Sequence, residues 1–253
     1  MLDPNTLPPW SLVILAFGVA FLYASVGLGG GSGYLAAMSL FVIATPLIAS
    51  TALTLNILAA SVAFLTYRQR GHFEPTLLWP FLLTSIPAAF LGGYLRLPDT
   101  LYLMILYVVL AYVGLHLLFW EPVIPTPSIS RRVSWLTILL SGFVIGLLSG
   151  MVGLGGGIFL SPLIVLTGWG TPKQAAAASS AFVVVNSASG LLGRILGGTF
   201  VLGILGASLL PVGFAGALLG SRLGARYLSA RWLRRLLGLV LLLTVVSYLY
   251  QSL

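Results

Sequence analysis

Glycine, proline and charged residues divide the chain into ten apolar segments, and these segments limit what it can fold into. They cover residues 10–27, 32–44, 47–67, 76–95, 100–120, 134–152, 158–169, 173–193, 199–221 and 232–251. A helix needs about 20 apolar residues to cross the hydrocarbon of a bilayer, and most of these segments approach that length. Their runs are unbroken, whereas a membrane barrel has alternating strands of roughly ten residues. We therefore predict an all-α, polytopic membrane protein.

The balance of charged and apolar residues agrees with a membrane location. Hydrophobic residues make up 59% of the chain and charged residues 6%, against about 25% charged in soluble domains. This composition excludes a soluble enzyme and a disordered chain. The net charge is +8, but the basic residues cannot form a nucleic-acid-binding groove between such apolar segments. We therefore expect no nucleic-acid partner. The chain has no cysteine, which excludes thiol chemistry and cysteine-held metals, and we expect neither metal nor cofactor.

A glycine-rich hexapeptide occurs twice. The sequence VGLGGG at 26–31 recurs 126 positions later at 152–157, and Thr-Pro and Arg-x-x-Gly follow both copies in the same register. Glycine runs match by chance, but three motifs in one register do not. We therefore predict a first repeat at 1–120 and a second at 134–253, joined by a proline-containing linker at 121–133.

The distribution of basic residues indicates how the two repeats are oriented. Each repeat holds five segments, an odd number, so the second would be inverted relative to the first. If all ten segments change sides, ten of the twelve lysines and arginines share one side, and only Arg96 and Arg194 lie on the other. If the two short segments, 32–44 and 158–169, re-enter instead, the split is seven to five. Because bases stay on the cytoplasmic side, the larger asymmetry favours alternation of all ten, with the N-terminus outside.

The duplicated glycines are the first candidate for a functional site. Each cluster interrupts an apolar run just before a short segment, which exposes backbone N–H groups at a new helix N-terminus, and these groups favour an anion. Close helix packing is the alternative explanation for any single glycine, but it does not explain the duplication. Two inverted helix breaks are typical of a substrate site at the membrane midplane. The expected contacts are Gly29, Gly30, Gly31, Gly155, Gly156 and Gly157.

Polar residues in segments 47–67 and 173–193 are the second candidate. An asparagine in hydrocarbon is costly unless it is paired or faces water. Bonds between helices would explain it at well under about 2 kcal/mol each, and we assign Ser61 and Ser189 to such packing. We expect Asn56, Ser180 and Asn186 to line the anion path as neutral donors.

The charged residues add two expectations. The four carboxylates are at segment ends or in loops, so no intramembrane acid is present to couple ion movement. Arg68 and Arg194 occupy matching positions in the two repeats, where snorkelling to the headgroups is the plain explanation. Under inversion they would also attract anions at the two mouths of the pathway.

Two other function classes compete with transport. Gly30-Gly31-Ser32-Gly33 fits the Gly-x-Ser-Gly pattern of intramembrane serine hydrolases. Such an enzyme needs a histidine at depth, whereas His72 lies in a loop and His116 near a segment end. A membrane scaffold without transport activity is the third class. We favour a transporter, not an enzyme.

The second repeat carries motifs that resemble the TauE/SafE sulfite-exporter family. They are the glycines of 153–157, Pro162-Leu163, Pro172, Ala175, Ser179-Ser180, Asn186-Ser187 and Arg194, and the first repeat matches with 27–31, Pro46 and Ala49. The likeness covers nearly the whole chain. One departure is Ala36, where the first repeat of the family commonly has proline, so the first helix break is expected to be less sharp.

The resemblance implies a bacterial or archaeal inner-membrane transporter of small sulfur-containing anions such as sulfite and sulfonates. Its partners would be the anion, the lipid bilayer and, as one option, a second copy in a homodimer. The identity of the anion, the direction of transport and proton coupling remain open at this stage. We expect alternating access by rocking of one half against the other, with the glycine and proline breaks as hinges.

Overall fold

The computed structural model describes residues 3–25, 29–41, 43–119, 134–227 and 230–252. Within these ranges the chain is helical and forms no sheet. The elements are α1 (Trp10–Ser25), α2 (Gly31–Ser39), α3 (Thr45–Gln69), the short 3-10 turn η1 (Pro75–Leu77), α4 (Trp79–Tyr94), α5 (Asp99–Phe119), α6 (Trp135–Val152), α7 (Gly157–Leu166), α8 (Pro172–Leu196), α9 (Gly203–Tyr227) and α10 (Ala230–Ser252). The prediction of an all-α polytopic membrane protein is confirmed.

Five of these helices are long and apolar enough to cross a membrane: α3, α5, α6, α8 and the Gly203–Arg222 part of α9. α1 and the Leu237–Tyr250 part of α10 are shorter apolar helices. The most buried of the five are α3 and α8, each with 67% of its apolar window inside the protein, against 39–44% for the others. These two helices pack on each other, and they position the polar residues discussed below.

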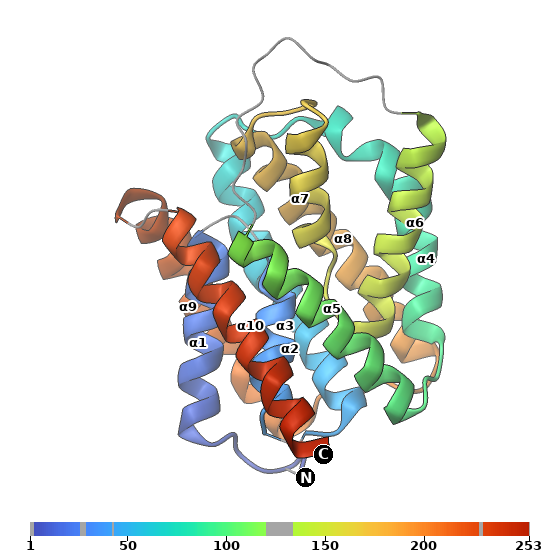
Figure 1. Ribbon diagram of the computed structural model, residues 1–253, viewed down its shortest axis with the longest axis vertical. Helices are drawn as coiled ribbons and strands as arrows, with labels where there is room; N and C mark the ends of the chain where they lie inside the picture. The colour runs from blue at the N-terminus through green and yellow to red at the C-terminus, as the bar shows by residue number, and fades with distance from the viewer. Residues whose placement is uncertain (1–2, 26–28, 42, 120–133, 228–229, 253) are drawn as a thin grey trace.

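The two short segments form helices α2 and α7, of 9 and 10 residues. At 1.5 Å per residue, each covers only about half of a hydrocarbon core of about 30 Å. In Figure 1, α6 descends from the upper end and α7 returns to it, with the glycine segment as the turn. No charged residue lies in either turn. The alternation of all ten segments, which the distribution of basic residues favours over re-entry of the two short ones, stays a prediction.

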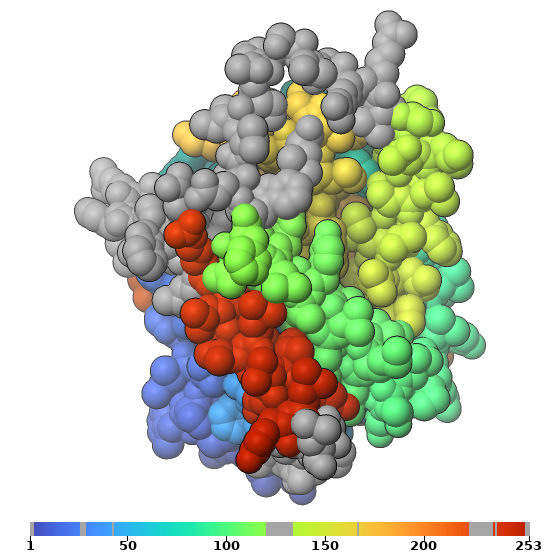
Figure 2. All heavy atoms as spheres, viewed as in Figure 1, coloured from blue at the N-terminus to red at the C-terminus, as the bar shows by residue number. Residues whose placement is uncertain are grey.

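Helices from the two predicted repeats interleave. α1 packs along α9, and α6 packs along α4, so the first helix of each repeat has its main partner in the other repeat. Glycines make the close approach possible, because a Cβ on Gly150 would overlap the backbone of Ala89, and one on Gly220 would overlap that of Phe21. The outermost pair, α5 and α10, pack on each other and cover the central helices on the face seen in Figures 1 and 2.

Candidate functional site

The two glycine segments meet beside α3 in the interior. A Cβ added to Gly31 would overlap the carbonyl of Leu154 and lie 2.8 Å from Nδ2 of Asn56. A Cβ on Gly155 would lie 3.0 Å from the same Asn56 Nδ2. The structure therefore brings together Gly31, Gly155 and Asn56, three residues that sequence analysis selected from three different segments.

Both short helices begin directly at this meeting point. The N-cap residues are Gly30 (φ 93°) and Gly156 (φ 79°), in the left-handed conformation that favours glycine. Neither N-terminus has a side-chain cap, so capping does not occupy the N–H groups of the first turn. Gly30 and Gly156 thus start their short helices in the same way. Residues 26–28 of the first break lie outside the described residues, so the expectation attached to Ala36 stays a prediction.

Asn56 connects the first half of the chain to the glycine segment of the second. Its side chain is fully buried, and Nδ2 donates to the carbonyl oxygen of Gly153 at 3.1 Å. Its Oδ1 has no hydrogen-bond partner. An unpaired amide oxygen in the interior costs free energy. Such a cost is expected where the oxygen bonds water or a ligand in another conformation.

Helix α8 closes the opposite side of the meeting point. Val183 lies 2.5 Å from the Cβ positions of Gly29 and Gly157 and 2.8 Å from that of Gly155. Ser187 Oγ lies 3.0 Å from the Gly155 position. Sequence analysis did not select Val183, which carries no polar signal. Ser187 could have been selected from its place beside Asn186.

The other two predicted donors are buried on α8 but bond to their own helix. Ser180 Oγ donates to the carbonyls of Ala176 at 2.9 Å and Ala177 at 3.0 Å. Asn186 Nδ2 donates to Phe182 O at 3.0 Å and leaves its Oδ1 unpartnered. In this conformation the hydroxyl of Ser180 donates to the backbone of its own helix, whereas the amide oxygen of Asn186 accepts no hydrogen bond.

Unpartnered buried polar atoms are concentrated on the central helices. Within the described residues they are Tyr34 OH, Thr51 Oγ1, Asn56 Oδ1, Ser85 Oγ, Ser149 Oγ, Ser179 Oγ, Asn186 Oδ1, Ser187 Oγ, Arg194 Nε and Thr199 Oγ1. Six of the ten belong to α3 and α8. Each such group costs free energy when it is buried without a hydrogen bond. Helices α3 and α8 therefore carry donors and acceptors that are not used in this conformation.

The two arginines proposed for the mouths have different surroundings. Arg68 is exposed at the end of α3, with its guanidinium 6.0 Å from the ring centroid of Phe64. Arg194 is only 5% exposed, and its Nη2 donates to Met151 O at 2.6 Å and Gly150 O at 3.3 Å. Snorkelling is therefore wrong for Arg194, because its cation is drawn inward by the last carbonyls of α6.

Ser32 is paired with a phenol. Its Oγ lies 2.6 Å from Tyr23 OH, and the residue is buried in the interior, with 2% of its surface exposed. His116 stacks on Tyr112, and His72 packs against Tyr67. This geometry provides Ser32 with no imidazole base.

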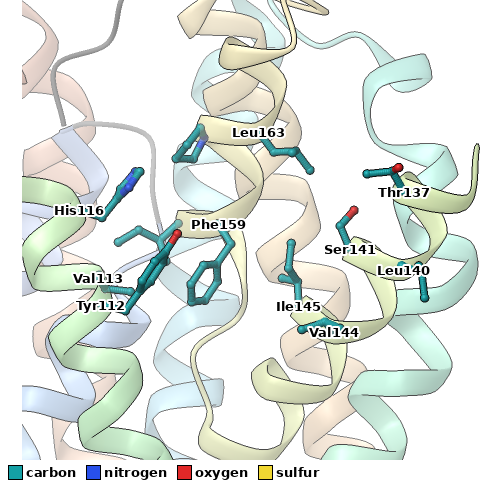
Figure 3. A pocket seen from close by; sticks show the side chains of 12 residues that line it. Tyr112, Val113, His116, Thr137, Leu140, Ser141, Val144, Ile145, Phe159 and Leu163 are labelled. Carbon is teal, nitrogen blue, oxygen red and sulfur yellow. The ribbon is translucent and has the colours of Figure 1, made fainter. Parts of the chain in front are cut away.

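A large crevice lies between α5, α6 and α7 (Figure 3). It adjoins the glycine centre through Ile145, which lines it and lies 2.7 Å from the Cβ position of Gly156. It has a volume of about 460 Å³ and is mainly apolar, with Tyr112 of α5 stacked on Phe159 of α7 at 5.9 Å between centroids. His116 and Ser141 are among its few polar residues. Such a lining suits hydrocarbon and gives an anion little to bind.

Comparison with known proteins agrees with this architecture. Residues 12–248 match the family described as Sulfite exporter TauE/SafE. The chain is also 33% identical over 248 residues, covering 94% of this chain and 97% of the relative, to the "Probable membrane transporter protein y4hK" of Sinorhizobium fredii (strain NBRC 101917 / NGR234). No solved structure gives a significant match. The match extends over nearly all ten helices, and the protein is therefore a membrane transporter that belongs to the TauE/SafE sulfite exporter family.

Proposed function

We propose that the protein carries a small sulfur-containing anion, such as sulfite or a sulfonate, across the inner membrane, and holds it between the glycine breaks that precede α2 and α7. The family supplies the substrate class. The observation that carries the site is the convergence of two uncapped helix N-termini on Asn56. Helix N-termini bind anions through their N–H groups and dipoles, and no described carboxylate is among the nearest atoms at Gly31 or Gly155.

Substrate would enter only when the glycine segments part. In this conformation they are in backbone contact, since no Cβ fits between Gly31 and Leu154. Separation would free the N–H groups of both short helices and expose the unpartnered oxygens of Asn56 and Asn186 and the hydroxyl of Ser187. The form in which the glycine segments touch would thus be the state between two open ones, as alternating access requires.

The energy for export need not come from a coupled ion. An inside-negative potential provides about 2.3 kcal/mol per charge per 100 mV for an anion that leaves the cell. The acids Glu74 and Asp99 lie before η1 and at the start of α5, outside the glycine centre. We therefore propose facilitated movement, with ten alternating segments, two inverted repeats and the N-terminus outside.

Transport is tested with purified protein in proteoliposomes. We expect uptake of radiolabelled sulfite above protein-free vesicles, and competition by thiosulfate, taurine or sulfoacetate that identifies the preferred head group. Thermal unfolding in detergent against the same anions and sulfate gives an independent ranking. If no anion moves and none raises the unfolding temperature, the proposal is rejected in favour of a scaffold.

A matched pair of glycine variants tests the site itself. Gly156 and Gly71 both have positive φ, 79° and 74°, so valine strains the backbone similarly at each. The Cβ at Gly71 meets nothing within 4 Å, whereas that at Gly156 meets Ile145 and Phe182 at 2.7 and 2.8 Å. We expect Gly156→Val to lose flux and Gly71→Val to keep it. Normal flux in folded Gly156→Val would exclude the glycine site.

A further inference from the structure

A second polar cavity lies away from the glycine centre, at the ends of α4 and α8. It has a volume of about 140 Å³, and polar and apolar atoms contribute similarly to its wall. Its polar lining consists of Thr45, Arg96, Tyr102, Arg194 and Thr199. Two arginines in one small cavity are unusual in a chain with few charges, and they provide the chemistry of an anion site.

These two arginines are also the pair that stands apart in the charge distribution. If the ten segments alternate, Arg96 and Arg194 are the only bases on their side of the membrane. The rule that places bases in the cytoplasm does not account for them. Because both arginines line one cavity, a role in that cavity would explain their position.

Arg194, which lines this cavity, has one N–H group without a hydrogen-bond partner. The residue is 95% buried by its 5% exposure, two of its contacts are the carbonyls of Gly150 and Met151, and its Nε has no partner. A guanidinium carries five N–H donors, and an unused one on a buried cation is costly. The neighbouring Thr199 hydroxyl is also buried and unpartnered.

Arg96 faces the same cavity from the segment between α4 and α5. Its Nε donates to Gly197 O at 2.9 Å, and its Nη2 lies 3.0 Å from the Cβ position of Gly198. The bond to Gly197 fixes the plane of the guanidinium, which favours bidentate recognition of an oxyanion. Arg96 itself is exposed, so this side of the cavity opens to the solvent.

One acid lies close to this site. Asp99, at the start of α5, accepts a hydrogen bond from the Thr45 hydroxyl through Oδ1. With two guanidinium groups against one carboxylate, the cavity keeps a net charge of +1. The carboxylate is outside the lining, so it reduces the positive field without taking the place of an anion.

We infer that this cavity binds a small oxyanion, a sulfite or the sulfonate group of a larger molecule, between Arg96, Arg194 and Thr199, and that it is the capture site from which substrate reaches the glycine centre. The role of the cavity in capturing substrate rests on the proposed transport function, but the binding of an anion there does not. Arg194 joins the two places physically, because it holds the end of α6 immediately before the glycine segment.

Equilibrium binding provides the first test. Sodium sulfite is titrated calorimetrically into purified protein in detergent, with Arg96→Gln and Thr199→Val as variants and Arg70→Gln as the control. Arg70 is an exposed arginine at the C-cap of another long helix, α3, so the control removes the same charge elsewhere. We expect Kd to rise about tenfold in Arg96→Gln, the loss of one charge-assisted bond, to rise in Thr199→Val, and to stay unchanged in Arg70→Gln.

Flux provides the second test. In proteoliposomes, Arg96→Gln should raise the KM for sulfite in parallel with Kd and leave the maximal rate intact, because the glycine centre is untouched. Wild-type Kd and KM in both Arg96→Gln and Thr199→Val would overturn the inference. If no anion is transported but sulfite binding still depends on Arg96, the site stands and the transport proposal falls.

Discussion

The side chain of Asn56 donates a hydrogen bond to the backbone of Gly153, 97 residues further along the chain. This bond joins α3, the more buried of the two candidate membrane spans in the first half, to the glycine segment of the second. It also holds the amide against the Cβ positions of Gly31 and Gly155. One neutral residue thus contacts both helix breaks, and its loss should affect structure and transport together.

We expect Asn56→Leu to lower the free energy of unfolding by about 1–3 kcal/mol, because it leaves the Gly153 carbonyl unpaired, and to abolish sulfite flux. Thr54→Val on the same helix is the control, since its hydroxyl donates only to Ser50 O in the preceding turn. Denaturation in mild detergent and proteoliposome flux measure the two effects. Full flux in Asn56→Leu would show that the amide is structural only.

Gly31→Ala should disrupt the centre. The new methyl group would overlap the Leu154 carbonyl, and neither backbone can move without disturbing Asn56. Gly18→Ala is the matched control, because a Cβ there meets nothing within 4 Å. Thermal unfolding should show a clear loss for the first variant and little change for the second. Equal stabilities would mean that the glycine segments are already apart in the membrane.

Ser32→Ala should keep transport. The hydroxyl is bonded to Tyr23 OH at 2.6 Å, so its removal costs about 1 kcal/mol of stability, and Tyr23→Phe should cost a similar amount. Flux measured beside unfolding separates the two quantities. A complete loss of activity in Ser32→Ala, with stability preserved, would instead support a nucleophilic serine.

Arg194→Lys should destabilise the end of α6. Lysine keeps the charge but cannot reproduce the guanidinium contacts to Gly150 and Met151, and we expect a loss of about 1.5–3 kcal/mol. Arg68→Lys, at the matching exposed position, should unfold like the wild type. A comparison of the two midpoints in denaturant gives the answer, and equal midpoints would deny Arg194 its anchoring role.

The sequence predicts where helices begin and end better than it predicts which distant residues come into contact. The short helices α2 and α7 and their glycine starts follow from the local interruption of apolar runs, which requires no knowledge of neighbours. The contrast between Arg68 and Arg194 could not be read from the repeat. The two positions match in register, but only Arg194 meets the carbonyl end of another helix. Val183 was missed for the same reason, since its role comes from three glycines that fold against it.

The pairing of α1 with α9 has a consequence for the order in which the chain is built. α1 ends at Ser25, and its partner begins at Gly203. A chain emerging from the ribosome therefore has to keep α1 in lipid, or beside an insertion factor, while most of the protein is still to be synthesised. Gly216 and Gly220, which fit against Phe17 and Phe21, arrive near the end. Completion of the packing of the first helix is thus a late event in biogenesis, and truncation before α9 should leave its Phe17 and Phe21 turns without their partner, while its contact with α2 remains.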